Sequence, residues 1–268
     1  VLDDFTEPAE SILTKAFSKL VAVDSRRWIK FLTDILPRFS CELAASLSDF
    51  EKRMLQMFYI TVFQEAADWS SHTTKANMQL LADSPIMIHE LYELLALNLE
   101  RIDFIDQPVP LGFDCPLDLH CTYTRDQILI AMDYMTPKNV REGVKWLPDK
   151  QVDVFFITLN KADKDYSPTT MYNDYSINES LFHWQSQSTT SDTASTGQRY
   201  INHRQRGSKV VLFVREFKQD GIGAAPYTCL GTAAYVKHTG SKPMNITWHL
   251  DQPIPAKYLR KTNKLVVG

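Results

Sequence analysis

Hydrophobic residues recur at helical spacing through the first hundred residues of the chain. Residues 25–39, 46–69 and 84–102 each place apolar side chains three or four positions apart, which is typical of amphipathic helices. Ser48 and Glu51 stand in capping-box positions at the start of the second segment. The pattern predicts a helical bundle. The apolar residues on the three stripes are Trp28, Phe31, Leu32, Ile35, Leu55, Phe58, Val62, Phe63, Ile88, Leu91, Leu95 and Leu99.

The periodicity changes in the second half of the chain. Residues 106–122 are rich in Pro and Gly, as in a linker, and a short helix is expected at 122–135, where Thr124 and Gln127 form another capping box. Later segments rich in β-branched and aromatic residues predict a curved, mostly antiparallel sheet or barrel. About fifty irregular, polar residues separate the first two of these segments, a length typical of functional loops. The expected strands lie at 152–159, 208–217, 226–240 and 244–250.

These patterns predict an α+β fold with two domains. An α-helical domain with its linker is expected at residues 1–122 and a β-rich domain at residues 123–268. Residues 1–122 hold 10 Lys and Arg against 19 Asp and Glu, a net charge of −9, whereas residues 123–268 hold 19 against 13, a net charge of +6. A basic half favours a polyanionic partner, and the acidic half is suited to other protein surfaces.

Several classes of protein are disfavoured by what the sequence lacks. No apolar run is long enough to cross a bilayer and the first residues do not resemble a signal peptide, so we expect a cytoplasmic protein. The 4 cysteines are widely scattered, which favours reduced thiols over a disulfide framework. His120 beside Cys121 does not match a zinc-binding pair, and neither phosphate-binding loops nor hydrolase motifs occur. The sequence therefore predicts a protein without catalytic activity of its own, without a cofactor and without a metal ion.

A basic segment at residues 197–218 is the first candidate for ligand binding. Its cations are interleaved with tyrosine and amide side chains, a mixture that suits contacts with a phosphate backbone. The alternative is a solvated loop without a partner, and the residues alone leave both open. The four cations expected to contact a backbone are Arg199, Arg204, Arg206 and Lys209.

A second candidate lies at residues 172–190, where aromatic and acidic side chains precede a run of Gln, Ser and Thr. A base taken out of a duplex is held between aromatic faces and by hydrogen bonds to its Watson–Crick edge. Tyr172, Tyr175 and Trp184 can supply such faces. Asp174 can accept a hydrogen bond from the amino group of cytosine, whereas it would oppose the acceptor oxygen of thymine. The alternative is that the rings form core of the sheet domain while Asp174 caps a turn.

A long, collinear resemblance covers residues 145–256 and extends more loosely over the helical half. The run DVFFITLNKADKDYSPTTMYNDYSINESLFHWQSQSTTS, continuing through TGQRYINHRQRGSKVVLFVREF to PYTCLGTAAYVKHTGSKPMNITWHLDQPIPA, resembles the C-terminal region of large bacterial proteins that join a phospholipase-D-like nuclease to a superfamily 2 helicase. Proteins of that architecture include modification-dependent, or type IV, restriction endonucleases. These use ATP to cleave DNA that carries 5-methylcytosine or 5-hydroxymethylcytosine.

The resemblance implies that the region is a target-recognition part, similar to SRA and PUA-like barrels that flip a modified base into a pocket. The nearest match to such a pocket is Tyr172, Asp174 and Tyr175, with Trp184 as a further stacking residue. The implied partners are double-stranded DNA with a modified cytosine and the nuclease and helicase domains of a longer bacterial protein. This sequence has neither the nuclease nor the helicase motifs, so we expect a recognition fragment rather than an enzyme.

Two other functions stay open on the sequence. Several PUA-like modules bind RNA, so the β-rich domain could recognise modified or structured RNA. Alternatively, the chain could be a scaffold that regulates a helicase, with the aromatic residues forming only core.

Overall fold

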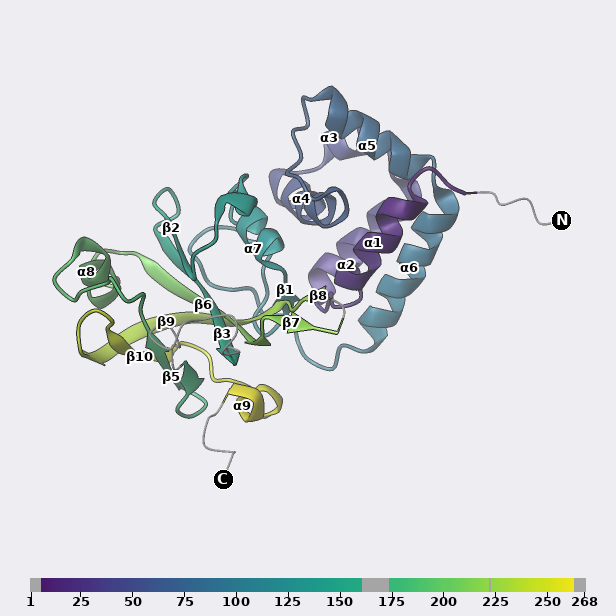
Figure 1. The fold of residues 1–268 in the computed structure, drawn as a ribbon. Helices are drawn as coiled ribbons and strands as arrows, with labels where there is room; N and C mark the ends of the chain where they lie inside the picture. Colours follow the sequence, from purple (N-terminus) through teal and green to yellow (C-terminus); the bar gives the residue numbers. More distant parts are fainter. Residues whose placement is uncertain (1–5, 161–173, 222, 263–268) are drawn as a thin grey trace. The chain divides into compact units, whose positions relative to one another are not determined.

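The computed structural model describes residues 6–160, 174–221 and 223–262. They form two compact units, which we call the helical unit and the sheet unit (Figure 1). The helical unit comprises Val1–Pro108 and Asp114–Val140, and the sheet unit comprises Val109–Phe113 and Arg141–Gly268. The expected domain boundary between residues 122 and 123 stays a prediction, because compactness alone does not define separate domains.

The helical unit is built from helices whose starts are specified locally. Serine or threonine side chains accept hydrogen bonds from backbone N–H groups at the N-termini of α2, α3, α4, α5 and α7. The two capping boxes predicted at Ser48 and Thr124 are both present. The elements are α1 (Glu10–Leu20), α2 (Arg26–Ile35), the 3₁₀ turn η1 (Leu36–Arg38), α3 (Cys41–Ser46), α4 (Asp49–Phe63), α5 (His72–Ala82), α6 (Pro85–Glu100), β1 (Thr122–Tyr123), α7 (Arg125–Ala131) and η2 (Pro137–Asn139).

Helix α4 forms the centre of the helical unit. Every residue from Met54 to Val62 is buried, so this helix is enclosed on all sides rather than amphipathic. It packs against α1, α2 and α7. The polar atoms buried beside it are paired: the Trp28 indole N–H donates to the carbonyl oxygen of Met54 at 3.0 Å, and Gln127 donates to the Thr61 hydroxyl at 2.8 Å. The predicted helical bundle is therefore confirmed.

The sheet unit is a mixed sheet with the strand order β2-β3-β6-β9-β10-β5-β4. Strands β3 and β6 run parallel, and the other neighbours in this order are antiparallel. The elements are β2 (Val144–Leu147), β3 (Val152–Asn160), β4 (Tyr175–Ser176), β5 (Leu181–Gln185), α8 (Ser195–Ile201), β6 (Lys209–Phe217), the small hairpin of β7 (Gln219–Asp220) and β8 (Gly223–Ala224), β9 (Tyr227–Thr239), β10 (Asn245–Leu250) and α9 (Ala256–Thr262).

The predicted α+β class is confirmed, and so are the four expected strands, which are β3, β6, β9 and β10. The structure corrects two details. The described strands form an open sheet, not the barrel that was the second expected form. The stretch between β3 and β6, expected to be irregular, contains β4, β5 and α8. Two further strands and a helix thus occur in a segment whose composition is typical of loops.

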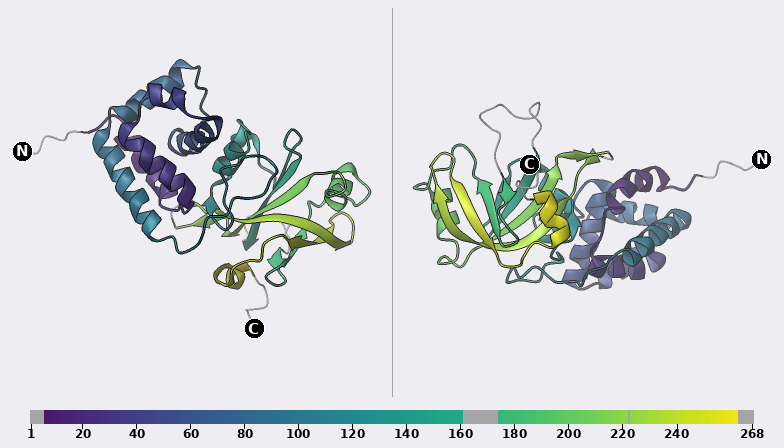
Figure 2. Two further views of the ribbon diagram at one scale, coloured as in Figure 1. Left: turned by 180° about the vertical axis from the view of Figure 1, so that it is seen from behind. Right: turned by 90° about the horizontal axis from the view of Figure 1, so that it is seen from below.

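Strand β9 gives the sheet its curvature, which is visible in Figure 2. The register of β9 against β6 shifts between Leu212 and Phe213, and its register against β10 shifts between Thr247 and Trp248. Gly231, with a φ of 85°, lies at the first shift, where a left-handed residue is needed. Because a bulge bends a strand and increases its twist, β9 can pair with β6 along one part and with β10 along the next.

An aromatic core fills one face of the curved sheet. Phe155 of β3 lies at its centre, with ring centroids at 4.3 Å from Trp184, 5.5 Å from Tyr200 and 5.6 Å from Trp248. Neighbouring residues of each strand point to the opposite face, where Phe156, Phe213 and Tyr227 pack together. Among the described residues, none of the helices combines the length and apolar character required to cross a membrane.

Candidate nucleic-acid interface

The connection between α8 and β6 presents a short, exposed basic loop on the sheet unit. Arg204 and Arg206 are exposed, and so are the two residues that flank Arg206 in sequence. The backbone N–H of Arg206 donates to the carbonyl oxygen of Asn202 at 3.0 Å. The backbone N–H of Ser208 donates to the carbonyl oxygen of His203 at 2.9 Å. The ends of the loop are therefore fixed while its cations face solvent.

His203 anchors this loop from below. Its ring is buried, its Nε2 accepts from the backbone N–H of Tyr235 at 3.1 Å, and its Nδ1 lies 3.2 Å from the carbonyl oxygen of Ser208. Because the backbone N–H can only donate, the neutral ring carries its proton on Nδ1 and donates to Ser208. Burial lowers the pKa of His203, since the charged ring is disfavoured away from water. The two hydrogen bonds of this histidine therefore connect the loop to β9.

A polar pocket of about 350 Å³ opens beside the loop. Lys209 reaches across it and donates to the carbonyl oxygen of Pro110 at 2.6 Å. Asp251 stands in the same pocket, where it accepts from Arg204 at 2.8 Å and from the Thr232 hydroxyl at 2.7 Å. The lining residues are Pro110, His203, Arg204, Gly207, Ser208, Lys209, Thr232, Ala233 and Asp251.

The expected cations thus fall into two groups. Arg204 and Lys209 line the pocket, and Arg206 is exposed on the adjoining loop. Arg199 differs from these cations because it is paired within the protein. It donates two hydrogen bonds to the carboxylate of the fully buried Asp153, at 2.7 and 2.9 Å. Its guanidinium also lies 4.6 Å from the centroid of the Trp146 ring. Its charge is balanced inside the protein, so we give Arg199 the structural role of tying α8 to β3.

The expected base-binding residues do not all meet. Tyr172 lies outside the described residues. Asp174 is buried, and its Oδ1 accepts from the backbone N–H of Gln185 at 2.9 Å. Tyr175 stacks on His183 with centroids 4.8 Å apart and an angle of 15° between the planes.

Trp184 lies on the opposite face of the sheet from Tyr175. Tyr175 is paired across the strands with His183, and Trp184 is the next residue of β5, so its side chain points the other way. It is only 5% exposed and belongs to the aromatic core with Phe155. Asp174 directly precedes Tyr175 in the chain, whereas Trp184 belongs to the core on the opposite face of the sheet from Tyr175.

Comparison with protein families identifies one matching family model. The family model described as Domain of unknown function (DUF3427) matches residues 117–261, more than half of the chain. The chain belongs to the DUF3427 family. In general, this domain is found in helicase-associated proteins. No curated protein matches the chain.

The DUF3427 match covers most of the sheet unit, including the basic loop and every lining residue of the pocket except Pro110. Sequence reasoning identified the cations of the pocket but missed Asp251, Thr232 and His203. These residues join the loop only through the pairing of β9 with β6 and β10, and nothing local in the sequence indicates that arrangement. Asp153 was missed for a related reason, because a lone carboxylate inside an apolar strand gives no clue to its partner 46 residues away.

Among the described residues, no group of three or more His, Cys, Asp or Glu side chains is arranged to hold a metal ion. The cysteines Cys115, Cys121 and Cys229 are buried. Burial raises the pKa of the Cys115 thiol to about 12, so at neutral pH this group is a neutral, unreactive thiol. These cysteines are suited to packing rather than to chemistry.

Proposed function

We propose that this chain is a DNA-recognition module whose sheet unit binds the phosphate backbone through the basic loop and recognises a modified cytosine nearby. The observation that carries the proposal is the presence of Arg204 and Lys209 in one polar pocket, with Arg206 exposed on the same loop. Cations that replace counterions on phosphates supply most of the affinity for nucleic acid without reading its sequence.

The pocket has the donors that a phosphate group requires. Arg204 and Lys209 provide charged donors, and the exposed Arg206 extends the positive surface beyond the rim. Asp251 now pairs with Arg204, so it also keeps the guanidinium in place before a ligand arrives. A phosphate that enters would take over the hydrogen bonds that Arg204 now gives to Asp251.

Recognition of the base is the finer part of the proposal. The described residues that support it are Asp174 and the stacked pair of Tyr175 and His183. Aromatic stacking holds a base without sequence preference, and a carboxylate selects the amino group of cytosine. Trp184 is left out of this site because it belongs to the core. In the resemblance described above, this region would be the target-recognition part of an ATP-dependent restriction endonuclease.

The test is the binding of the whole chain to matched labelled duplexes with cytosine, 5-methylcytosine or 5-hydroxymethylcytosine at one fixed salt concentration. Fluorescence anisotropy should show tighter binding to at least one of the modified duplexes. Asp174→Asn keeps an oxygen for the Gln185 N–H but loses the negative charge. We expect it to remove the preference while leaving the weak binding to plain DNA.

The backbone contacts are tested separately with Arg206→Ala. This variant should weaken binding to all three duplexes alike, because a phosphate contact carries no base information. Lys15→Ala is the matched control, since it removes one exposed cation from the helical unit. Equal affinity of the wild-type chain for all three duplexes would exclude modified-base recognition. Preference for the matching RNA would favour the RNA-binding alternative, and no binding to any nucleic acid would favour the scaffold.

A further inference from the structure

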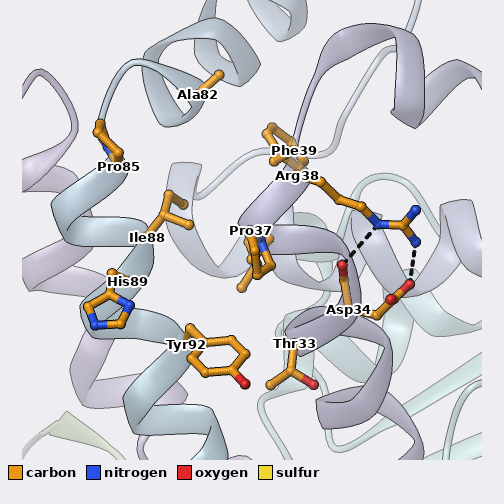
Figure 3. A pocket seen from close by; sticks show the side chains of 11 residues that line it. Thr33, Asp34, Pro37, Arg38, Phe39, Ala82, Pro85, Ile88, His89 and Tyr92 are labelled. Carbon is orange, nitrogen blue, oxygen red and sulfur yellow. Dashed lines mark hydrogen bonds and ion pairs between the residues drawn. The ribbon is translucent and has the colours of Figure 1, made fainter.

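A second concave surface lies on the helical unit, and unlike the pocket beside the basic loop it is lined mostly by apolar residues. It is a groove of about 850 Å³ between one wall formed by α2 and η1 and another formed by the end of α5 and the first half of α6. Figure 3 shows Ile88 and Tyr92 of one wall on the side that faces Pro37 and Thr33 of the other. We call it the α2–α6 groove. Its apolar lining is supplied by Leu36, Pro37, Phe39, Pro85, Ile88 and Tyr92.

The sequence explains why this groove is apolar and open. Pro37 lies in η1, just after the end of α2, and Pro85 is the first residue of α6. Proline is tolerated at both positions because no helical N–H is required there. Both prolines are exposed at the lips of the groove. Phe39 and Ile88 are 9% and 7% exposed and form its floor. Apolar side chains thus continue from the floor to the surface, as in a site for a packed partner.

The helix that forms one wall of the groove is acidic. Helix α6 carries Glu90, Glu93 and Glu100, all exposed, and has no Lys or Arg from Pro85 to Glu100. Glu93 follows Tyr92 and lies one turn beyond His89, both of which line the groove, so it stands at the edge of the lining.

Arg38, the arginine that lines the opposite wall, is paired within the protein. Arg38 donates to the Asp34 carboxylate at 2.5 Å and to the Asp34 carbonyl oxygen at 3.1 Å, which neutralises the pair. The groove therefore offers an apolar floor with uncompensated negative charge on its α6 side.

We propose that the α2–α6 groove docks a basic amphipathic helix of a partner protein. The stretch of α6 that lines the groove, Pro85 to Tyr92, is about two turns long, which matches a helix that inserts residues at positions i, i+3 or i+4, and i+7. Lysine or arginine residues beside that apolar stripe would lie near Glu93. Charge complementarity of this kind gives specificity and a faster encounter. A polyanion is disfavoured by the same acidic helix, so this surface is independent of nucleic-acid binding.

The probes are two helical peptides of about five turns that share one leucine stripe and differ only in flanking lysines or glutamates. Binding of each fluorescent peptide to the whole chain is measured by anisotropy. The lysine peptide should bind at least tenfold more tightly than the glutamate peptide. Glu93→Lys should weaken the lysine peptide and strengthen the glutamate peptide, a reversal that a purely structural role of Glu93 would not produce.

A second variant tests the floor. Ile88→Ala should weaken the lysine peptide at least fivefold, whereas Val21→Ala, which truncates an exposed apolar residue of the same unit, should leave binding unchanged. Circular dichroism and urea unfolding verify that each variant is folded. Equal affinity for the two peptides, no binding of either, or insensitivity to Glu93→Lys would each overturn the proposal.

Discussion

At the scale of single residues, Asp251 pairs with Arg204, so in the proposed interface it would compete with a phosphate for that guanidinium. Their ion pair spans 2.8 Å and is partly exposed, so we expect it to be worth no more than about 1 kcal/mol. Asp251→Asn should therefore tighten binding to a plain DNA duplex, by up to about fivefold at low salt, because Arg204 is released and one negative charge is removed. Fluorescence anisotropy measures the change.

The control for this variant is Asp149→Asn, which removes an exposed carboxylate of the sheet unit without freeing Arg204. A gain of equal size in both variants would show that net charge alone is responsible. Weaker binding of Asp251→Asn would mean that the carboxylate positions Arg204 for the ligand instead of competing with it.

His203 gives the fold a dependence on pH. Burial lowers its pKa in the folded state below the unfolded value of about 6.5. The unfolded chain therefore binds the proton more readily, and the contribution of this residue to stability is lost as the pH falls below about 6.5. The free energy of unfolding, measured with urea, should decrease from pH 7 to pH 5.

His203→Gln supplies the comparison, because an amide can still donate to Ser208 and accept from Tyr235 but does not titrate. The loss between pH 7 and pH 5 should be smaller in this variant. An identical loss in both proteins would assign the pH dependence to other groups.

The sequence allows the exposure of a residue to be predicted where local composition sets it, but not a contact that a distant partner decides. The exposed cations Arg204 and Arg206 were identified because a run of charges belongs in water. Arg199 belongs to the same run, yet its role depends on the buried Asp153 of another strand. Trp184 was ambiguous for the same reason, since the face to which it points follows from strand register.

At the scale of elements, helix α8 depends on the absence of a side chain at Gly197. A Cβ at this position would collide with the backbone of Ser191 and Asp192, which cannot move as a flexible side chain can. Gly197→Ala should therefore lower the free energy of unfolding by about 1–3 kcal/mol, as overpacking usually does. Urea unfolding checks the value. Gly221→Ala, where a Cβ meets nothing within 4 Å, is the matched control and should change stability little.

The helices were predictable because their signals are local. The capping box at Ser48 and the one at Thr124 each lie within four consecutive residues, and both formed as expected. The parallel pairing of β3 with β6 was not predictable, because it joins segments separated by β4, β5 and α8. Strand β5 itself alternates between half-buried and buried residues, a signal hidden by its polar surroundings.

At the scale of the whole molecule, an acidic helical unit and a basic sheet unit are suited to different kinds of partner. If Arg204, Arg206 and Lys209 each replace one counterion on duplex DNA, the logarithm of the binding constant should fall with the logarithm of the salt concentration with a slope of about −2.7. Arg206→Ala should make that slope less steep by about 0.9.

Titration of the whole chain with a plain duplex at several salt concentrations measures the slope, and Lys15→Ala should leave it unchanged. A slope near zero in the wild-type chain would remove the phosphate contacts from the proposed interface.

The open form of the sheet also has a consequence for solubility. A closed barrel has no free strand edges, whereas the described sheet ends in β2 on one side and β4 on the other. Unpaired edges are templates for a strand of another molecule. Strand β4 is only 2 residues long, and β2 is 4 residues long with Lys145 among them, so each edge resists addition of a foreign strand by shortness or by charge. Replacing Lys145 with an apolar residue would accordingly favour aggregation before it affected binding.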